Sequence, residues 1–236
     1  MVECAEILIV IPARGGSKRL PHKNILPLAG KPLICHTIEV ALRANLEARI
    51  MVTSDDEEIL RIAQRYQDVG VLLHRRPPQL ATDSALTSDV LVDAIRAERS
   101  ANYDPDTLML LQPTSPLRET QDIFDGLALF REHGCENSVV SVCRVDHPAS
   151  WRGMLQNGML CGIKPLEGSK HLEPEFRLNG AIYVASVRRF LEMNSVFTET
   201  LHAHVMPEER SVDIDTLLQF RLCETLISMK AEGIYK

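Results

Sequence analysis

The sequence predicts an α/β fold, in which helices cover a mainly parallel central sheet. Short apolar runs rich in β-branched residues alternate along the chain with amphipathic stretches of helical length, an order typical of right-handed β–α–β crossovers. The first run, Ile7–Ile11, is apolar on both faces, as in a strand that helices cover on both sides. Of the 236 residues, 45% are hydrophobic and 25% are charged. This is ordinary globular usage and argues against disorder and fibrous architectures.

The first part of the chain contains four predicted strands, each followed by a predicted helix. The strands are predicted at Ile7–Ile11, Arg49–Ser54, Val69–Leu73 and Leu108–Leu111. The helices are predicted at Leu33–Ala44, at Glu57–Tyr66, at Ser88–Glu98 and from Thr120 to about Glu132. Asp55 and Asp56 stand at the N-cap position of the second helix, and Thr120 at that of the fourth.

A fifth predicted strand, Ser138–Cys143, is followed by a break in the alternation. From about residue 144 to residue 175 the chain is too rich in Pro and Gly for a helix to persist. Within this segment, Met154–Leu160 has an Asn157-Gly158 turn between two short apolar stretches, the pattern of a β-hairpin. We expect an inserted hairpin that projects from the sheet as a lid or a dimerisation arm. An irregular surface excursion is the alternative.

The β–α pattern then resumes and continues to the end of the chain. It returns at Gly180–Val184, continues with a short strand at Ser211–Asp215 and closes with a helix from Thr216 to about Lys230. We therefore predict a single domain over residues 1–236, with an inserted arm at about 144–175.

Charge and composition limit the possible partners. The chain has 26 Lys+Arg against 32 Asp+Glu, a formal charge of −6, so we expect no nucleic-acid partner. No apolar run approaches the ~20 residues of a membrane helix, and we expect no membrane partner. The start of the chain lacks the basic region of a secretory signal. The six cysteines are scattered without a C-x-x-C pair, which predicts reduced thiols and a cytoplasmic protein.

A basic, glycine-containing loop, Pro12–Asn24, directly follows the first strand. In open α/β sheets ligands bind beyond the carboxyl ends of the strands, so this loop is in position to bind one. Gly15 and Gly16 allow the backbone to approach a ligand closely. The loop carries four cations, Arg14, Lys18, Arg19 and Lys23. Such a cluster in an acidic protein favours an anion, with triphosphate the natural ligand, although a solvated basic loop is the alternative.

Two carboxylates, Asp213 and Asp215, are expected to share one face of the last short strand. Adjacent carboxylates repel unless a cation lies between them, and Mg²⁺ accepts one or two carboxylates together with phosphate oxygens. The alternative is that Asp215 caps the helix that starts at Thr216. From these residues alone, both interpretations remain open.

Two further segments carry polar groups at strand ends. Gln112-Pro-Thr-Ser-Pro-Leu-Arg118 ends a central strand with amide and hydroxyl groups that suit a sugar or carboxylate ligand, although the same pattern also fits a plain turn. Arg177 and Asn179 share a strand face, which pairing within the sheet explains almost as well.

These four segments, in this order, resemble the acylneuraminate cytidylyltransferases, also called CMP-sialic acid synthetases. The similarity runs from Ile7 to about Leu226 and rests on Ile11–Asn24, Leu110–Arg118, Arg177–Tyr183 and Asp213–Asp215. The octulosonate cytidylyltransferases share the opening Pro-Ala-Arg but resemble the chain less at the later motifs. The resemblance implies a Rossmann-like, three-layer α/β/α nucleotidyltransferase. It also implies a homodimer in which the hairpin arm reaches into the partner's site.

The resemblance further implies a reaction and a set of site residues. CTP and a nine-carbon 2-keto sugar acid would give the CMP-sugar and pyrophosphate, with Mg²⁺ as cofactor held by Asp213 and Asp215. The implied nucleotide-binding residues are Ala13, Arg14, Gly15, Gly16, Ser17, Lys18, Lys23, Asn24, Arg76, Ala85 and Thr87. The implied sugar-binding residues are Gln112, Arg177, Asn179, Tyr183 and Phe197. The implied catalytic residues are Arg14, Lys23 and Asp215, with Asp215 acting either as general base or as metal ligand.

The departures from the family's pattern lie at the sugar end. A basic residue common there is replaced by Ala149-Ser150-Trp151, and an aromatic pair is represented by Val196-Phe197. We therefore expect a nonulosonate, with legionaminic acid as credible as N-acetylneuraminic acid. Two alternatives are another sugar acid, such as 3-deoxy-octulosonate, and a non-catalytic nucleotide-binding regulator on the same fold. The intact Asp213 and Asp215 argue against the regulator.

Overall fold

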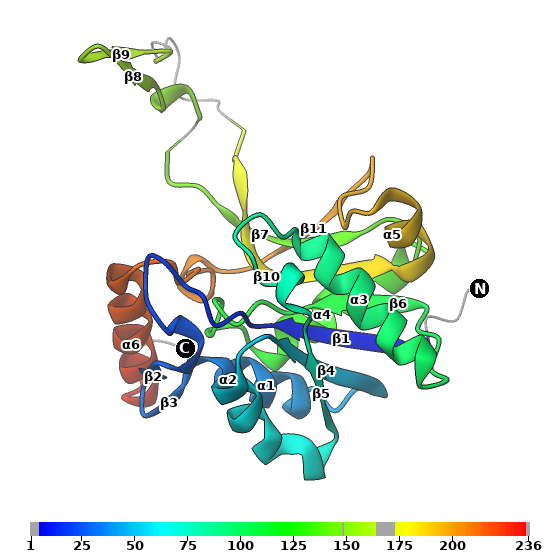
Figure 1. The fold of residues 1–236 in the computed structure, drawn as a ribbon. Coiled ribbons are helices and arrows are strands. Elements are labelled where there is room, and N and C mark those ends of the chain that lie inside the picture. The colour runs from blue at the N-terminus through cyan, green and yellow to red at the C-terminus, as the bar shows by residue number, and fades with distance from the viewer. Residues whose placement is uncertain (1–4, 148, 164–172, 235–236) are drawn as a thin grey trace.

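The central feature of the fold is a seven-stranded sheet with the strand order β11-β7-β10-β6-β1-β4-β5 (Figure 1). The computed structural model describes residues 5–147, 149–163 and 173–234. The strands of this sheet are β1 (Ile7–Pro12), β4 (Ala48–Ser54), β5 (Val71–Arg75), β6 (Thr107–Leu110), β7 (Val139–Arg144), β10 (Phe176–Ser186) and β11 (His202–Val205). Only β10 runs antiparallel to its neighbours, β6 and β7. The prediction of a mainly parallel sheet is confirmed.

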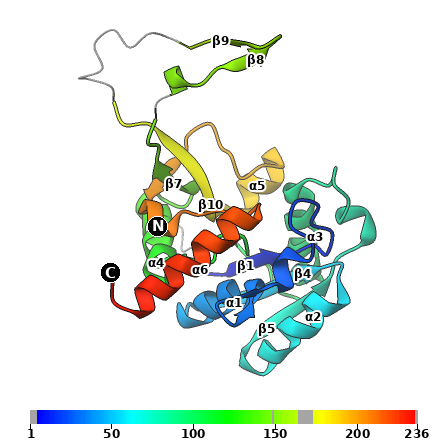
Figure 2. The same cartoon turned by 90° about the vertical axis from the view of Figure 1, so that its left-hand side faces the viewer.

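Helices cover both faces of the sheet (Figures 1 and 2). They are α1 (Leu33–Arg43), α2 (Glu57–Ala63), α3 (Thr87–Ser100), α4 (Thr120–Glu132), α5 (Val187–Met193) and α6 (Leu217–Ala231). Side chains of α1, α2 and α4 form one apolar cluster on the sheet, and those of α3 and α5 form a second. α6 packs separately, against the segment that contains the short strands β2 (Pro27–Leu28) and β3 (Lys31–Pro32).

Strand β1 shows why its sequence is apolar throughout. Ile7, Ile9 and Ile11 belong to the first cluster, whereas Leu8 and Val10 belong to the second. Successive side chains of a strand point to opposite faces, so a strand between two helical layers must be apolar at every position. Helices on both sides of this strand, as its apolar run predicted, are confirmed, and so is the three-layer fold that the resemblance implied.

The inserted hairpin consists of β8 (Met154–Gln156) and β9 (Met159–Cys161), which pair antiparallel. Asn157 and Gly158 both have positive φ, 50° and 82°, as a two-residue type I′ turn requires. The hairpin projects far from the sheet (Figure 1). Part of the predicted arm, residues 148 and 164–172, lies outside the described residues.

Four sequence predictions need correction. Residues 211–215 form no strand, because one backbone hydrogen bond, from Ile214 N–H to the carbonyl oxygen of Thr114, takes the place of a ladder. The cap of α4 is Glu119 and not Thr120, since Glu119 and Asp122 form a capping box. The fold also contains α5 and β11, which the sequence pattern did not predict. Finally, Cys135 is disulfide-bonded, so the expectation of six reduced thiols is wrong.

Within the described part of the chain, no helix is both long enough and apolar enough to cross a membrane.

Candidate functional site

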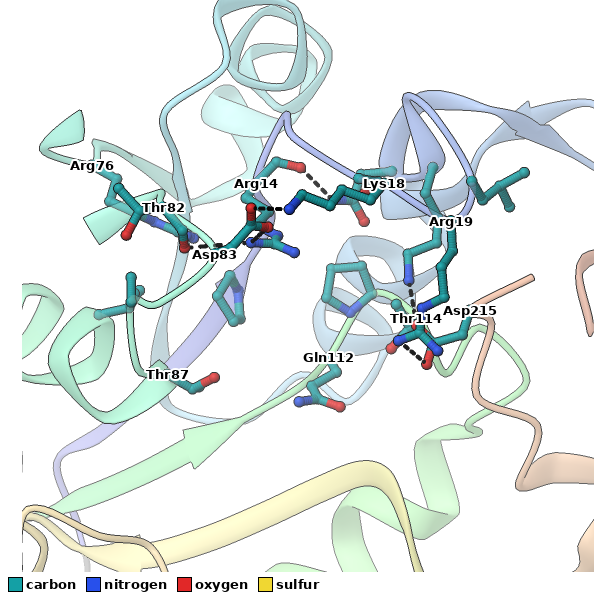
Figure 3. Close-up of a pocket in the computed structure, with 18 of the residues that line it drawn as sticks. Arg14, Lys18, Arg19, Arg76, Thr82, Asp83, Thr87, Gln112, Thr114 and Asp215 are labelled. Carbon is teal, nitrogen blue, oxygen red and sulfur yellow. Dashed lines mark hydrogen bonds and ion pairs between the residues drawn. The ribbon is translucent and has the colours of Figure 1, made fainter. Parts of the chain in front are cut away.

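A cavity of about 550 Å³ lies beyond the carboxyl ends of β1 and β6 (Figure 3). Its walls come from the loop after β1, the residues between β5 and α3, the residues after β6 and the segment before α6. The lining residues are Pro12, Arg14, Ser17, Lys18, Arg19, Leu20, Lys23, Asn24, Arg76, Leu80, Thr82, Asp83, Ala85, Thr87, Val90, Gln112, Pro113, Thr114, Asp213 and Asp215. The basic loop and the two carboxylates therefore face one cavity, although they lie at opposite ends of the sequence.

Asp83 binds two of the four loop cations. Its Oδ1 lies 3.2 Å from Arg14 Nη1, and its Oδ2 lies 2.6 Å from Lys18 Nζ. The Lys18 ammonium holds the pKa of Asp83 below its usual range, and Arg14 acts in the same direction. Arg14 Nη1 also donates to the carbonyl oxygen of Thr82, at 3.4 Å.

Asp215 binds the other two cations. Its Oδ2 lies 2.9 Å from Arg19 Nη2, and its Oδ1 lies 3.1 Å from Lys23 Nζ. Lys23 is the most enclosed of the four, with 12% of its side chain exposed, and its Nζ also donates to the carbonyl oxygen of Ile214 at 2.6 Å. Asp215 does not cap α6. Thr216 does so in a capping box with Gln219, so the capping interpretation of Asp215 is wrong, while metal binding by Asp215 stays a prediction.

Asp213 adds a second carboxylate beside Asp215. Burial raises the pKa of Asp213, and the charge of Asp215 raises it further, against a hydrogen bond from Thr114 that lowers it. A carboxylate in this position is costly when charged, unless a cation shares it. No group of three or more His, Cys, Asp or Glu side chains forms a metal site among the described residues. Two hard oxygen donors with room for phosphate oxygens nevertheless fit Mg²⁺.

Gly15 of the basic loop is required by close packing that the sequence did not reveal. Gly15 N–H donates to Asp55 Oδ1 at 3.2 Å, and a Cβ on Gly15 would lie 2.5 Å from Asp56 Oδ2. Gly16 has no atom within 4 Å of such a Cβ. Ala13 is fully buried. None of the three lines the cavity, so their role in nucleotide binding stays a prediction.

Arg76 and Asn24 are buried polar residues of the cavity wall. Arg76 Nη2 donates to the carbonyl oxygen of Thr53 at 2.8 Å, while its Nε has no hydrogen-bond partner in the described part of the chain. Burial lowers the pKa of Arg76. Asn24 Nδ2 donates to the carbonyl oxygen of Arg14 at 3.0 Å and so fixes the start of the loop. Ala85 and Thr87 also line the cavity (Figure 3 labels Thr87).

Gln112 is the predicted sugar-end residue that lines the cavity. Its carbonyl oxygen accepts a hydrogen bond from Arg118 Nη2 at 2.8 Å. Gly180 adopts φ +76°, and a Cβ there would lie 2.7 Å from Gln112 Oε1. Glycine at 180 therefore allows the backbone turn and leaves room for the Gln112 amide.

Two other predicted sugar-end residues, Arg177 and Asn179, do not line this cavity. Arg177 lines a second cavity, of about 310 Å³, at the base of the arm. Asn179 is buried and binds Ser141 and Ser211, at 2.6 and 2.9 Å. The alternative of a role within the sheet therefore describes Asn179, and substrate binding by both residues stays a prediction.

Tyr183 and Phe197 also lie outside the lining. They form an edge-to-face pair with ring centroids 6.2 Å apart. Burial raises the pKa of Tyr183, and the charge of Asp213 raises it further. Their role in sugar binding stays a prediction.

Several residues of the cavity lining were given no individual role in binding or catalysis from the sequence. These are Arg19, Leu20, Leu80, Thr82, Asp83, Val90, Pro113 and Thr114. Arg19 and Thr114 lie inside motifs that had been singled out. Asp83 gave no local signal, because its partners stand 65 or more positions earlier in the chain.

The comparisons with known proteins agree with this geometry. The sequence model of a family described as Cytidylyltransferase matches residues 8–138. The CMP-N,N'-diacetyllegionaminic acid synthase of Legionella pneumophila is 36% identical over 235 residues, which cover 97% of this chain and 99% of that protein. The N-acylneuraminate cytidylyltransferase of Escherichia coli is 34% identical over 95% of this chain, which spans 53% of that longer protein.

A more distant relative and a solved structure complete the comparison. The pseudaminic acid cytidylyltransferase of Campylobacter jejuni is 28% identical over 97% of this chain and 99% of its own length. The structure of CMP:2-keto-3-deoxy-manno-octonic acid synthetase complexed with CTP superimposes with a TM-score of 0.71. It is 19% identical and covers 95% of this chain and 99% of that one. At this identity the structural match shows the fold alone.

Proposed function

The chain belongs to the cytidylyltransferase family, and from this premise we propose that it transfers a cytidylyl group from CTP to a nine-carbon 2-keto sugar acid of the sialic or legionaminic acid type. One observation carries the proposal: the basic loop and the acidic segment meet in one cavity, with Lys23 Nζ 3.1 Å from Asp215 Oδ1. A magnesium–nucleotide needs cations for its phosphates and carboxylates for its metal, and this cavity supplies both.

The proposed reaction needs no covalent enzyme intermediate. The anomeric oxygen of the sugar bonds to the α-phosphorus of CTP, and the bond from that phosphorus to the bridging oxygen breaks. Pyrophosphate leaves with the electron pair, and the hydroxyl proton passes to Asp215 or to solvent. The protein therefore contributes chiefly orientation and stabilisation of charge on the phosphate oxygens.

Each wall of the cavity has a proposed role. Arg14, Lys18 and Lys23 bind the triphosphate, and Arg76 with Thr87 holds the cytosine. The remaining proposed nucleotide contacts are Ala13, Gly15, Gly16, Ser17, Asn24 and Ala85. Gln112 contacts the sugar, and Arg177, Asn179, Tyr183 and Phe197 complete the sugar end. Asp213 and Asp215 hold Mg²⁺, which when bound neutralises phosphate charge and activates the attacking oxygen.

The proposed sugar follows from the relatives. The legionaminate relative aligns over nearly its whole length, whereas the N-acylneuraminate relative is about twice as long as the aligned region. The pseudaminic acid relative also aligns over 99% of its length but at 28% identity, so the 36% identity of the legionaminate relative favours a legionaminic-type substrate, with N-acetylneuraminic acid as the second candidate. The proposed catalytic unit is one domain, residues 1–236, with the arm at about 144–175. We place it in the cytoplasm, as a homodimer joined through the arm.

The test is pyrophosphate release from CTP with Mg²⁺ and a panel of acids: legionaminic, N-acetylneuraminic, pseudaminic and 3-deoxy-octulosonic. We expect release with the first two, and a loss of at least about a hundredfold in rate for Asp215→Asn. Turnover of the octulosonate alone would replace the proposed substrate class. CTP binding without release for any acid would favour the non-catalytic regulator.

A further inference from the structure

Asp83 contacts two cations that the proposed function assigns to the triphosphate, yet nothing in that function requires a carboxylate there. It lies in the loop before α3, and its oxygens lie 3.2 Å from Arg14 Nη1 and 2.6 Å from Lys18 Nζ (Figure 3). All three side chains line the cavity. A polyphosphate that binds Arg14 and Lys18 therefore competes with the Asp83 carboxylate for these two cations.

The four loop cations are divided evenly between two carboxylates. Asp215 pairs with Arg19 and Lys23, whereas Asp83 pairs with Arg14 and Lys18. The two carboxylates differ in environment: the Asp83 side chain is 53% exposed and that of Asp215 is 34% exposed. Exposed ion pairs are weak and readily exchanged, so Asp83 is the carboxylate that a ligand displaces more easily.

We propose that Asp83 is an internal counter-anion, which competes with polyphosphate for Arg14 and Lys18 and thereby speeds the departure of pyrophosphate. This inference rests on the proposed cytidylyl transfer, since that reaction leaves pyrophosphate on the two cations. The carboxylate re-forms its ion pairs as pyrophosphate leaves, so the cations never remain without an anion. Because Asp83 competes with both molecules, it weakens the binding of CTP somewhat and also prevents pyrophosphate from remaining bound.

The loop geometry couples this exchange to the nucleotide site. Arg14 Nη1 also donates to the carbonyl oxygen of Thr82 at 3.4 Å, and Thr82 Oγ1 lies 3.2 Å from Ser84 Oγ. Ala85 and Thr87, which follow directly, line the same cavity. The contact with Arg14 therefore ties this loop to the basic loop on the other side of the cavity lining, and a polyphosphate that binds Arg14 competes with this contact.

The experiment compares Asp83→Asn with Asp68→Asn, which removes one negative charge at an exposed position outside the cavity. Binding of pyrophosphate, CTP and cytidine is measured by calorimetry at one fixed salt concentration. We expect Asp83→Asn to bind pyrophosphate and CTP about three- to tenfold more tightly, the range that two exposed ion pairs allow. Cytidine, which has no phosphate, and the Asp68→Asn protein should show no change.

Two further measurements distinguish competition for the cations from structural support of the loop. In Asp83→Asn the inhibition constant of pyrophosphate should fall by the same factor as its dissociation constant. When Lys18 is already replaced by Gln, Asp83→Asn should increase the affinity for pyrophosphate by a smaller factor, because Asp83 acts partly through Lys18.

Unchanged pyrophosphate affinity in Asp83→Asn overturns the inference. Weaker binding of both CTP and cytidine also overturns it, since this result assigns Asp83 to loop support. The proposed function is judged separately, by pyrophosphate release from CTP in the wild-type protein. If release is absent while Asp83→Asn still binds pyrophosphate more tightly, the proposed function fails and the counter-anion remains.

Discussion

Gly15 and Gly16 are neighbours of the same type, but they differ in the space that the structure leaves for a side chain. A Cβ on Gly15 would lie 2.5 Å from Asp56 Oδ2, whereas one on Gly16 would meet no atom within 4 Å. Asp56 is the N-cap of α2 and accepts hydrogen bonds from the N–H groups of Glu58 and Ile59, at 2.8 and 3.1 Å. Gly15 therefore allows the basic loop to pack on this cap.

We predict that Gly15→Ala destabilises the protein by about 1–2 kcal/mol, because the added methyl group displaces the Asp56 cap. Gly16→Ala is the matched control and should change the free energy of unfolding by less than about 0.5 kcal/mol. Urea denaturation of both variants measures the difference. Equal effects of the two substitutions would contradict the packing argument.

Asp213 provides a pH-dependent contribution to stability. Burial raises its pKa above the unfolded value, which is about 3.9. The folded protein therefore holds this proton more tightly than the unfolded chain does. The stability that Asp213 contributes is complete below about pH 4 and is lost as the pH rises through the raised folded pKa.

Asp213→Asn should make the metal-free protein more stable than the wild type at pH 7, since the variant has no buried charge to solvate. The difference should shrink as the pH falls toward about 4. Thermal unfolding at several pH values tests this expectation. Adding Mg²⁺ should stabilise the wild type and not the variant, and a variant that gains equally from Mg²⁺ would exclude Asp213 as a ligand.

At the scale of elements, the β8–β9 hairpin presents apolar side chains that the protein's own core does not cover. Leu155 and Leu160 are direct cross-strand partners and are 75% and 63% exposed. An isolated two-stranded hairpin is marginally stable in water. Exposed apolar groups on such an element are typical of a contact with another chain.

If the proposed homodimer forms through the hairpin, the double variant Leu155→Asp with Leu160→Asp should be monomeric, because burying charged groups in an apolar interface is costly. Gln156→Asp is the matched control on the same hairpin and should remain dimeric. Light scattering after size-exclusion chromatography measures the mass, and circular dichroism checks the fold. If the double variant has the same mass in solution as the wild type, the hairpin does not form the dimer interface.

At the scale of the whole molecule, the site exists because the sheet aligns strand ends from distant parts of the chain. β1 pairs parallel with both β4 and β6, so the loops after these strands leave the sheet at the same edge. The Asp213–Asp215 segment is then attached to this edge by Ile214 N–H, which donates to the carbonyl oxygen of Thr114 at 2.8 Å. A ligand in the cavity therefore connects both ends of the sequence.

Binding at such a site should stabilise the whole domain. Magnesium–CTP at a hundred times its dissociation constant should raise the free energy of unfolding by about 2.7 kcal/mol. Lys23→Met should lose most of this gain at the same ligand concentration, whereas Lys31→Met should keep it. Lys31 is the control because its ammonium pairs with Glu39 and does not line the cavity. Thermal shift assays measure the stabilisation by magnesium–CTP in each variant. Equal stabilisation of both variants would show that Lys23 does not bind the ligand.

The sequence by itself determined the features that depend on short-range patterns. The apolar run of β1, the Asn157-Gly158 turn and the clustering of cations after the first strand are each encoded within a few residues. Their physical causes, strand periodicity, turn geometry and charge density, act locally. They were sufficient to predict the sheet, the hairpin and the basic loop.

Only the tertiary structure decided which charges meet. The resemblance placed Lys23 and Asp215 in one site but did not give their direct contact across 192 positions, nor the hydrogen bonds that join Asn179 to Ser141 and Ser211. Contacts of this kind depend on how the sheet and helices pack, since a side chain's partners are set by distance in space and not by spacing along the chain. For the same reason, no sequence pattern could have assigned Asp83 to Arg14 and Lys18.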